Sequence, residues 1–549
     1  MIETIIKELK NQIFNIVQNI YSSNLNASNF TEEDVFFEVP ASKDHGDYST
    51  NVAFKLARIA RKAPNLIATD IVSQIDTDKA HVKKVEVVGG FINFFIDNNY
   101  LANVVFLINK EGENYSKSNI GNKEKVNIEY VSANPTGFLH IGHCRGAAYG
   151  DSLARILKKT GYDVTREYYV NDAGNQINNL AKSIYARYRE LYNLDFDLDD
   201  DCYKGPEIIV IAKEIEEKYQ DKYLKEEWFD DFRNIGTEKL LNTLKKDLKD
   251  FNVEFDVWSS ERSLYANGSV EKTIDYLISH DYTYEKDGAL WLKTTLYGDE
   301  KDRVIKKSDG SLTYLTPDIA YHADKLSRGY DQLIDVLGAD HHGYIPRLKA
   351  AIAFVGGNPD KLDVEILQMV RVMQNNVEIK MSKRSGRAIT MRDLIDEVGS
   401  DVLRYLFIEK ALSSQMDLDL DLALKEGSEN PVYYAQYAYA RIASLFRTYP
   451  EFKQVNEFKK LDISSIKDLI DCLIAYRNVV EEVALKRIPH RLCQYISDLA
   501  KALHSYYNNE KIISDDALLT NEKLTVLRSV QIILKDALGL IGVNTKERM

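Results

Sequence analysis

The chain has 549 residues, 44% of them hydrophobic and 28% charged, and carries a formal net charge of −13 at pH 7. This composition excludes a disordered or fibrous protein and argues against one that coats nucleic acid non-specifically, and the length predicts about three or four domains. No run of about 18 apolar residues and no CxxC pair is present, so we expect no membrane partner, no disulfide framework and no cysteine-rich zinc site.

Residues 1–112 predict a separate α+β domain that begins with an amphipathic helix. The segment VFFEVP (35–40) predicts a strand. Residues 43–64 then predict a turn and a helix, whose basic face would be formed by Lys55, Arg58, Arg61 and Lys62. Residues 83–97 predict two strands joined by a glycine turn, and a polar linker follows.

A second domain is predicted over 122–405. VNIEYVS (126–132) indicates a strand, 140–161 a helix, and VTREYYV (164–170) a second strand. A strand, helix and strand in this order form a βαβ unit, which favours a parallel nucleotide-binding sheet.

The rest of the chain is predicted to be mostly helical. Residues from about 178 to 285 are highly charged and indicate a helical insertion rather than another sheet layer. LIDVLGADHHGY (333–344) indicates a buried strand that ends in a loop. Residues 425–549 carry helical periodicity, which predicts an all-α bundle.

The strongest chemical signal is His140-Ile141-Gly142-His143, which lies between a predicted strand and helix. Backbone N–H groups and the helix dipole favour a phosphate at a helix start, and imidazoles there can stabilise charge that builds on it. Gly142 would leave room for a nucleotide. Solvated or structural histidines remain an alternative, and a metal-binding pair is a weaker one.

A second signal, Glu378-Ile-Lys-Met-Ser-Lys-Arg-Ser-Gly386, lies far along the chain. Lys380 and Lys383 within this short basic stretch could close over a triphosphate and neutralise departing pyrophosphate. Taken alone, the stretch is also typical of a solvated basic turn.

Together the two motifs resemble the HIGH and KMSKS signatures of class I aminoacyl-tRNA synthetases. EYVSANPTGFLHIGHCRG, EYYVNDAGNQI, GADHHGY and KMSKRSG resemble the arginyl-tRNA synthetase family in particular. HGDYSTNVAFKLA is similar to that family's N-terminal domain, and YYAQYAYARI with the terminal KERM to its helical anticodon-binding domain. The resemblance extends over essentially the whole chain.

This resemblance implies a Rossmann-type α/β catalytic domain, flanked by an N-terminal tRNA-contacting domain and a C-terminal anticodon-binding bundle. It implies an arginine–tRNA ligase, which forms arginyl-adenylate from arginine and ATP and then transfers arginine to the 3′-terminal ribose of its tRNA. ATP would enter with Mg²⁺ and no tightly bound metal. The catalytic residues would be His140, His143, Lys380 and Lys383, and ATP would also contact Gly142, Gly338 and Asp340.

Arginine selection requires carboxylates that face a planar guanidinium group. The candidate contacts for arginine are Glu129, Ser132, Asn134, Tyr314, Asp318 and His342. For each, an ordinary structural hydrogen bond is the alternative, and Asp318 could instead be an N-terminal helix cap. In the C-terminal bundle, Tyr433, Tyr437 and Arg441 could contact unpaired tRNA bases, although tyrosines at helical spacing are more often core residues.

We expect a cytoplasmic monomer with tRNA, L-arginine and ATP as partners. A cysteine-specific synthetase would require a zinc cluster, which the scattered cysteines do not provide. A small-molecule nucleotidylyltransferase would have no use for the bundle after residue 430. A synthetase-like RNA-binding or regulatory protein would be favoured by loss of the histidines and lysines, and all four are present.

Overall fold

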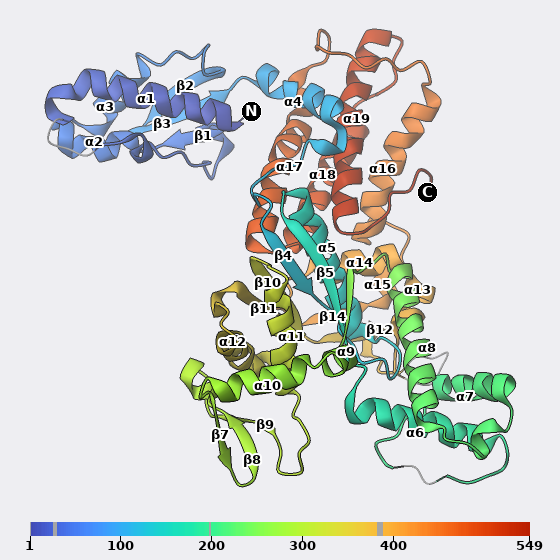
Figure 1. Ribbon diagram of the computed structural model, residues 1–549. Coiled ribbons are helices and arrows are strands. Elements are labelled where there is room, and N and C mark those ends of the chain that lie inside the picture. The colour runs from blue at the N-terminus through green and yellow to red at the C-terminus, as the bar shows by residue number, and fades with distance from the viewer. Residues whose placement is uncertain (1, 26–29, 197–198, 382–387) are drawn as a thin grey trace.

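The computed structural model describes residues 2–25, 30–196, 199–381 and 388–549. Three units follow one another along the chain (Figure 1): an N-terminal α+β unit, a central parallel sheet with appended helices, and a C-terminal bundle. Within the described residues, no helix is both long enough and apolar enough to cross a membrane.

The N-terminal unit packs helices against a small antiparallel sheet with strand order β1-β3-β2. Its elements are α1 (Ile2–Leu25), β1 (Tyr48–Thr50), α2 (Val52–Ala60), α3 (Pro64–Val72), β2 (Val82–Val88) and β3 (Phe91–Ile96). Gly89 and Gly90, both at positive φ, form the turn between β2 and β3, as predicted. The predicted strand VFFEVP is wrong: only Glu38 forms a bridge, to Ser49.

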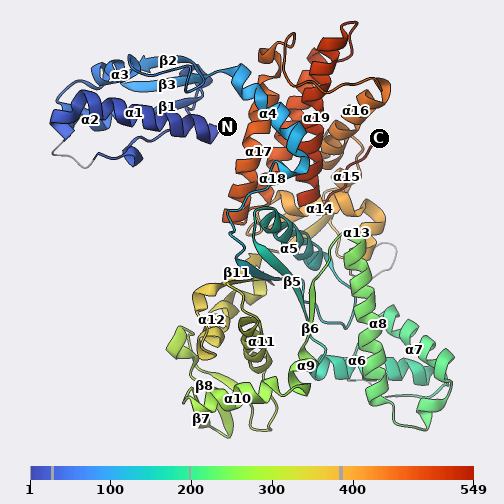
Figure 2. The same cartoon turned by 45° about the horizontal axis from the view of Figure 1, so that its top comes forward.

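A single residue, Asp97, separates β3 from α4 (Asn98–Glu111), and its side chain caps that helix. Helix α4 lies against α17 (Lys467–Lys486) and α19 (Ala517–Leu540) of the C-terminal bundle (Figures 1 and 2). Asn109 of α4 donates to the Thr525 carbonyl at 3.0 Å. The N-terminal unit is thus joined to the bundle by a packed helix.

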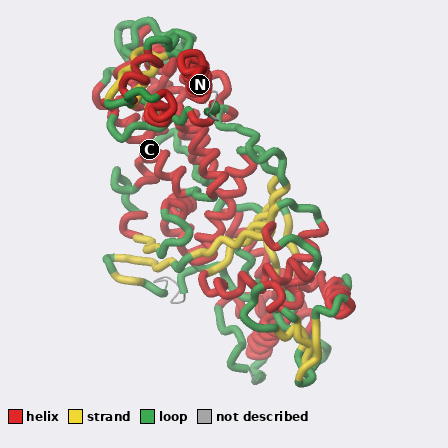
Figure 3. The backbone as a smooth tube through the Cα atoms, turned by 90° about the vertical axis from the view of Figure 1, so that its left-hand side faces the viewer, coloured by secondary structure: helices red, strands yellow, loops and turns green. Residues whose placement is uncertain are grey.

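The central sheet is fully parallel, with strand order β11-β10-β4-β5-β6. Figure 3 shows strands, in yellow, in the middle of the molecule, between helices on either side. Its strands are β4 (Lys125–Glu129), β5 (Asp163–Val170), β6 (Val257–Ser260), β10 (Gln332–Gly338) and β11 (Leu362–Leu367). The parallel βαβ prediction is confirmed, because β4 and β5 pair in parallel and α5 (Ile141–Lys159) connects them. On the opposite face from α5, helix α11 (Leu315–Ser327) places Lys325 against β4 and β10.

The predicted insertion is mainly helical but is shorter than expected. Helices α6 (Gly174–Glu190), α7 (Pro206–Tyr219) and α8 (Phe229–Asp250) pack around their own aromatic core, which includes Tyr185, Trp228 and Phe232. The chain then re-enters the sheet as β6, an edge strand that the highly charged sequence did not reveal. Helices α9 (Glu261–Ala266) and α10 (Ser269–Ser279) follow, and then the antiparallel strands β7 (Thr283–Lys286), β8 (Ala289–Leu292) and β9 (Arg303–Lys306).

After β10 the chain forms α12 (Ile345–Phe354) and β11, and then a second small sheet. This sheet contains β12 (Val370–Gln374), β13 (Val377–Glu378) and β14 (Met416–Asp419). Helices α13 (Met391–Val398), α14 (Ser400–Glu409) and α15 (Leu420–Ala423) lead to the bundle. The bundle consists of α16 (Pro431–Thr448), α17, α18 (His490–Asn509) and α19, and its core includes the fully buried Leu499, Leu503 and Leu534.

Candidate functional site

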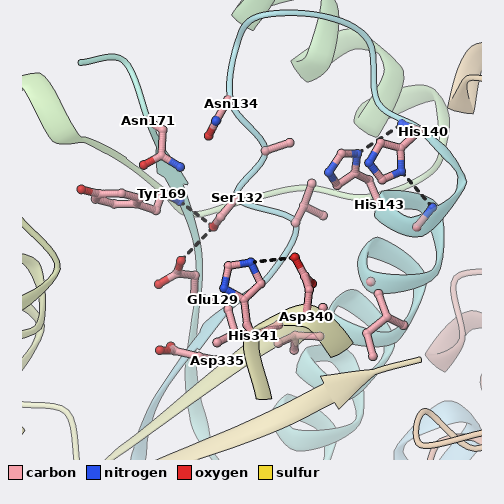
Figure 4. A pocket seen from close by; sticks show the side chains of 18 of the residues that line it. Glu129, Ser132, Asn134, His140, His143, Tyr169, Asn171, Asp335, Asp340 and His341 are labelled. Carbon is pink, nitrogen blue, oxygen red and sulfur yellow. Dashed lines mark hydrogen bonds and ion pairs between the residues drawn. The ribbon is translucent and has the colours of Figure 1, made fainter. Parts of the chain in front are cut away.

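A cavity of about 960 Å³ lies at the carboxyl ends of β4 and β10. Strand order reverses here, since β5 lies on one side of β4 and β10 on the other. Ligands of open parallel sheets bind in the crevice at such a point. Figure 4 shows Ser132 and Asn134 from the loop after β4, and Asp340 and His341 from the segment after β10, around this cavity.

The two histidines of the HIGH motif form the start of α5. His140 is the N-cap, and its Nδ1 accepts from the Gly142 N–H at 3.2 Å. The His143 Nδ1 accepts from the His140 N–H, also at 3.2 Å. The ring centroids are 3.7 Å apart. The two rings and the helix N-terminus therefore lie together at one end of the cavity (Figure 4).

The hydrogen bonds of these rings define their tautomers. A neutral imidazole that accepts at Nδ1 carries its proton on Nε2. Burial lowers the pKa of His140, and burial together with the His140 charge lowers the pKa of His143 to about 3. Both rings are therefore neutral Nε2–H donors near pH 7, beside the positive end of the helix dipole.

The segment that contains the second motif begins and ends near this helix start. His140 forms an antiparallel bridge with Thr390, and the Met391 N–H donates to the Leu139 carbonyl at 2.7 Å. Met381 and Ala388, the described residues on either side of 382–387, also form a bridge. Lys380 is exposed and does not line the cavity, and Lys383 lies outside the described residues.

Gly142, Gly338 and Asp340 all line the cavity. A Cβ atom at Gly142 would lie 3.1 Å from the His140 ring, so a side chain there would disturb the N-cap itself. At Gly338 a Cβ atom would lie 2.6 Å from Oδ1 of Asp340. The two glycines therefore allow His140 and Asp340 to adopt their positions, and the Asp340 side chain is 82% exposed.

The opposite wall carries most of the residues predicted to contact arginine: Glu129, Ser132, Asn134, Tyr314 and Asp318. The Ser132 hydroxyl donates to Oε1 of Glu129 at 2.9 Å and accepts from the Tyr169 N–H at 3.0 Å. Ser132 has a positive φ of 39°, and Val131 one of 70°, a strained conformation for a β-branched residue. This turn directs the Ser132 hydroxyl back toward Glu129 (Figure 4).

Asp318 lies in the first turn of α11, and its Oδ2 accepts from the Tyr344 hydroxyl. The N-cap of α11 is Tyr314, which makes no side-chain capping bond, so the alternative interpretation of Asp318 as a helix cap is wrong. Tyr314 itself is 77% exposed at the edge of the cavity. The Asn134 amide donates to Oε1 of Gln176.

His342 is not brought to the cavity. It lies in a 3₁₀ segment, Ala339–Tyr344, and is exposed, whereas the neighbouring His341 lines the cavity and lies 3.5 Å from Asp340. Successive side chains of a 3₁₀ helix point about 120° apart, which explains why only one of two adjacent histidines faces the site. The sequence offers no means of choosing between them.

Glu261 is a buried carboxylate beside the site that the sequence did not indicate; it does not line the cavity but lies close enough to Asp318 for their charges to interact. It starts α9 directly after β6 and is 7% exposed. Burial and the negative charges of Asp318 and Asp172 raise its pKa to about 7. Recognising Glu261 would have required placing β6 at the sheet edge, which the surrounding charged helices obscured.

In the bundle, the predicted tRNA-contacting residues lie on one face of α16. The rings of Tyr433 and Tyr437 stack at 6.2 Å, and Tyr437 also stacks on His504 of α18. Nη1 of Arg441 lies 3.1 Å from Nδ1 of His504, and its guanidinium covers the Tyr507 ring at 3.8 Å. Tyr437 is 39% exposed.

The core interpretation of the tyrosine series holds for Tyr439, which is 6% exposed and bonds to Glu547, but not for Tyr437. Across the ranges that the structure describes, no three His, Cys, Asp or Glu side chains are grouped as they would be to hold a metal ion.

Three family models match the chain. Residues 4–96 match the arginyl tRNA synthetase N-terminal domain, 104–425 the catalytic domain of class I (R) tRNA synthetases, and 435–549 the DALR anticodon binding domain. The chain is 51% identical over 527 residues to an arginine–tRNA ligase of Geobacillus kaustophilus, covering 94% of each protein. It is also 51% identical over 525 residues to that of Bacillus subtilis, with the same coverage.

Solved structures agree with these matches. A crystal structure described as a putative arginyl-tRNA synthetase of Campylobacter jejuni is 35% identical, with a TM-score of 0.77, and covers 82% of this chain and 100% of that one. Arginyl-tRNA synthetase of Thermus thermophilus shares the fold, with a TM-score of 0.71 at 20% identity, over 99% and 100% of the two chains. The chain therefore belongs to the arginine–tRNA ligase family of class I tRNA synthetases.

Proposed function

We propose that the cavity activates L-arginine with ATP and then passes the arginyl group to the 3′-terminal ribose of a bound tRNA. One observation carries the proposal: a single cavity has two imidazoles at a helix start at one end and the buried or half-buried carboxylates Glu129, Asp318 and Asp335 at the other. The first end suits a triphosphate, and the second suits a cationic amino acid.

At the phosphate end, His140 and His143 would donate Nε2–H hydrogen bonds to the phosphates of ATP, next to the N-terminal amides of α5. Asp340 would bind the ribose hydroxyls, and Gly142 and Gly338 would keep the surrounding backbone free of side chains. Lys380 and Lys383 would close over the β- and γ-phosphates, because the bridge between His140 and Thr390 anchors their segment beside the site. Mg²⁺ would arrive with ATP, bound through phosphate oxygens and water.

At the amino-acid end, Glu261 and Asp318 supply the specificity for arginine. Burial and the Asp318 charge raise the cost of ionising Glu261, so a cation beside these two carboxylates would be favoured. A guanidinium group offers five N–H donors in a plane, whereas a lysine ammonium is a point charge that cannot serve both carboxylates bidentately. Glu129, Ser132 and Asn134 would bind the remaining polar groups of the amino acid, and Tyr314 would cover it.

Both chemical steps then follow from positioning. An oxygen of the arginine carboxylate attacks the α-phosphorus in line, the bond to the β-phosphate breaks, and pyrophosphate leaves with its charge neutralised by the two lysines. In the second step a hydroxyl of the terminal tRNA ribose attacks the carbonyl carbon of the adenylate, and AMP leaves.

The tRNA would contact all three units: the N-terminal domain (1–112), the catalytic domain (122–405) and the anticodon-binding bundle (425–549). Tyr433, Tyr437 and Arg441 would stack on unpaired anticodon bases, since their rings already form a partly exposed platform. We further propose that the protein acts as a cytoplasmic monomer.

Arginine-dependent exchange between ATP and pyrophosphate tests this proposal. The exchange is measured with and without cognate tRNA, and lysine, cysteine and glutamate replace arginine in parallel reactions. We expect exchange with arginine alone among the four. Lack of exchange with arginine in the presence of tRNA, or equal exchange with lysine, would contradict the proposal.

A further inference from the structure

Three carboxylates lie side by side across the central sheet. Asp335 of β10 is the register partner of Glu129 of β4, and Glu129 is in turn the register partner of Glu167 of β5. Residues in register on parallel strands point to the same face of the sheet. All three side chains are buried, so this row would repel itself strongly without cations.

Helix α11 and the residue just after it supply two cations to this row. The Lys325 ammonium, which is fully buried, donates to Oε2 of Glu129 at 2.5 Å and to Oδ1 of Asp335 at 2.9 Å. One turn further on, Arg328 forms a bidentate pair with Glu167, with both bonds at 2.9 Å. Two permanent cations thus serve the three carboxylates of this row.

Two of these three carboxylates reach the cavity. Glu129 and Asp335 line the cavity, but Glu167 does not. Asp335 also bonds to His322 at 3.2 Å, while the second oxygen of Glu129 receives only the Ser132 hydroxyl. The groups that interact with Glu129 are Lys325, His322 and Tyr321 from α11, Asp335 from β10 and Tyr169 from β5, and Glu167 of β5 is its register partner.

We propose that Lys325 is a positioning residue for arginine binding: its ammonium keeps the Glu129 carboxylate ionised and aimed into the cavity, without touching the substrate. The inference rests on the proposed function, in which Glu129 binds the cationic amino acid. The pKa of Glu129 lies above its ordinary value, because burial and the Asp335 charge raise it by more than the Lys325 ammonium lowers it. Removal of the ammonium leaves burial unopposed, and Glu129 then takes up a proton and loses its attraction for a cation.

Arg328 provides a matched control. It neutralises a neighbouring carboxylate of the same row, but that carboxylate lies outside the cavity. Lys325→Gln and Arg328→Gln each remove one cation while retaining hydrogen-bond donors. A merely structural role for Lys325 predicts similar behaviour of both variants, and a positioning role predicts that they differ in arginine binding.

The test compares full-length wild type, Lys325→Gln, Lys325→Arg and Arg328→Gln by pyrophosphate exchange with tRNA, between pH 6.5 and 8.5. For Lys325→Gln we expect the arginine KM to rise about tenfold or more at pH 7, with the ATP KM unchanged. The ratio of this arginine KM to the wild-type KM at the same pH should fall toward one as the pH rises, because Glu129 ionises again. The comparison at each pH cancels the effect of Glu261, which both proteins share. Lys325→Arg restores the charge and should recover part of the affinity, and Arg328→Gln should leave the arginine KM unchanged.

Equal arginine KM values for Lys325→Gln and Arg328→Gln would overturn the inference. A Lys325→Gln to wild-type KM ratio that stays equally high at every pH would also overturn it. If Lys325→Gln does not fold, Lys325→Gln combined with Asp335→Asn removes one charge of each sign, and the same expectations apply to it. Absence of arginine-dependent exchange in the wild type would instead contradict the proposed function itself.

Discussion

Arginine affinity is expected to depend on pH through Glu261. Its pKa is raised to about 7 by burial and by Asp318 and Asp172, and only its ionised form attracts a guanidinium. With a pKa near 7, about nine tenths of Glu261 is ionised at pH 8 and about one tenth at pH 6. The dissociation constant for arginine should therefore rise about tenfold, or about 1.4 kcal/mol, as the pH falls across this range. His143 does not confound the measurement, because its pKa of about 3 keeps it neutral throughout.

Calorimetric titration of arginine into the protein at pH 6, 7 and 8 measures this dependence. At pH 7, binding should release about half a proton, which is detected by repeating the titration in buffers of different ionisation enthalpy. Glu261→Gln should weaken binding and remove the pH dependence, while Glu271→Gln, an exposed glutamate on α10, should retain both. An affinity that does not change between pH 6 and 8 in the wild type would refute the assigned role of Glu261.

Three further outcomes are expected. His143→Ala should slow arginine activation by about 10²- to 10³-fold, as loss of a preorganised donor does, and leave tRNA affinity unchanged; equal losses in both would indicate misfolding. Asp318→Asn should raise the arginine KM at least about tenfold, and a normal KM would exclude Asp318 from the guanidinium site. Tyr437→Ala should weaken tRNA binding by about 1–3 kcal/mol in a filter assay, whereas arginine binding to the free protein stays the same.

The sequence predicted correctly those elements whose local residue pattern matches the structure that they form in the fold. The parallel β4-α5-β5 unit and the two histidines at the start of α5 follow from periodicity and from the chemistry of helix termini. The predicted strand VFFEVP was wrong because a short apolar run does not by itself provide a neighbouring strand, and only Glu38 finds a partner, Ser49. His342 and His341 could not be separated, since the backbone of a short 3₁₀ segment decides which of them faces the cavity.

The charged floor of the site was not predictable from pattern at all. Lys325 looks like a solvent-facing helix residue in DIAYHADKLS, yet it is fully buried because three carboxylates on separate strands converge beneath it. The role of Glu261 likewise depends on Asp318, which is far from it in the sequence but close enough in the fold to raise its pKa. The surroundings of such residues depend on how separate strands and helices are placed next to one another, and no single segment of the sequence shows this.

The contact between the N-terminal unit and the bundle fixes the distance between these two parts of the protein. A single residue, the helix N-cap Asp97, separates β3 from α4, and α4 packs along α17 and α19. The Lys467 ammonium at the start of α17 also lies 3.5 Å from the Asp47 carboxylate of the N-terminal unit. The spacing between the N-terminal unit and the bundle is therefore set by packed helices and an ion pair rather than by a long linker. We expect that an RNA molecule bound by the N-terminal unit and the bundle at the same time has to fit this spacing.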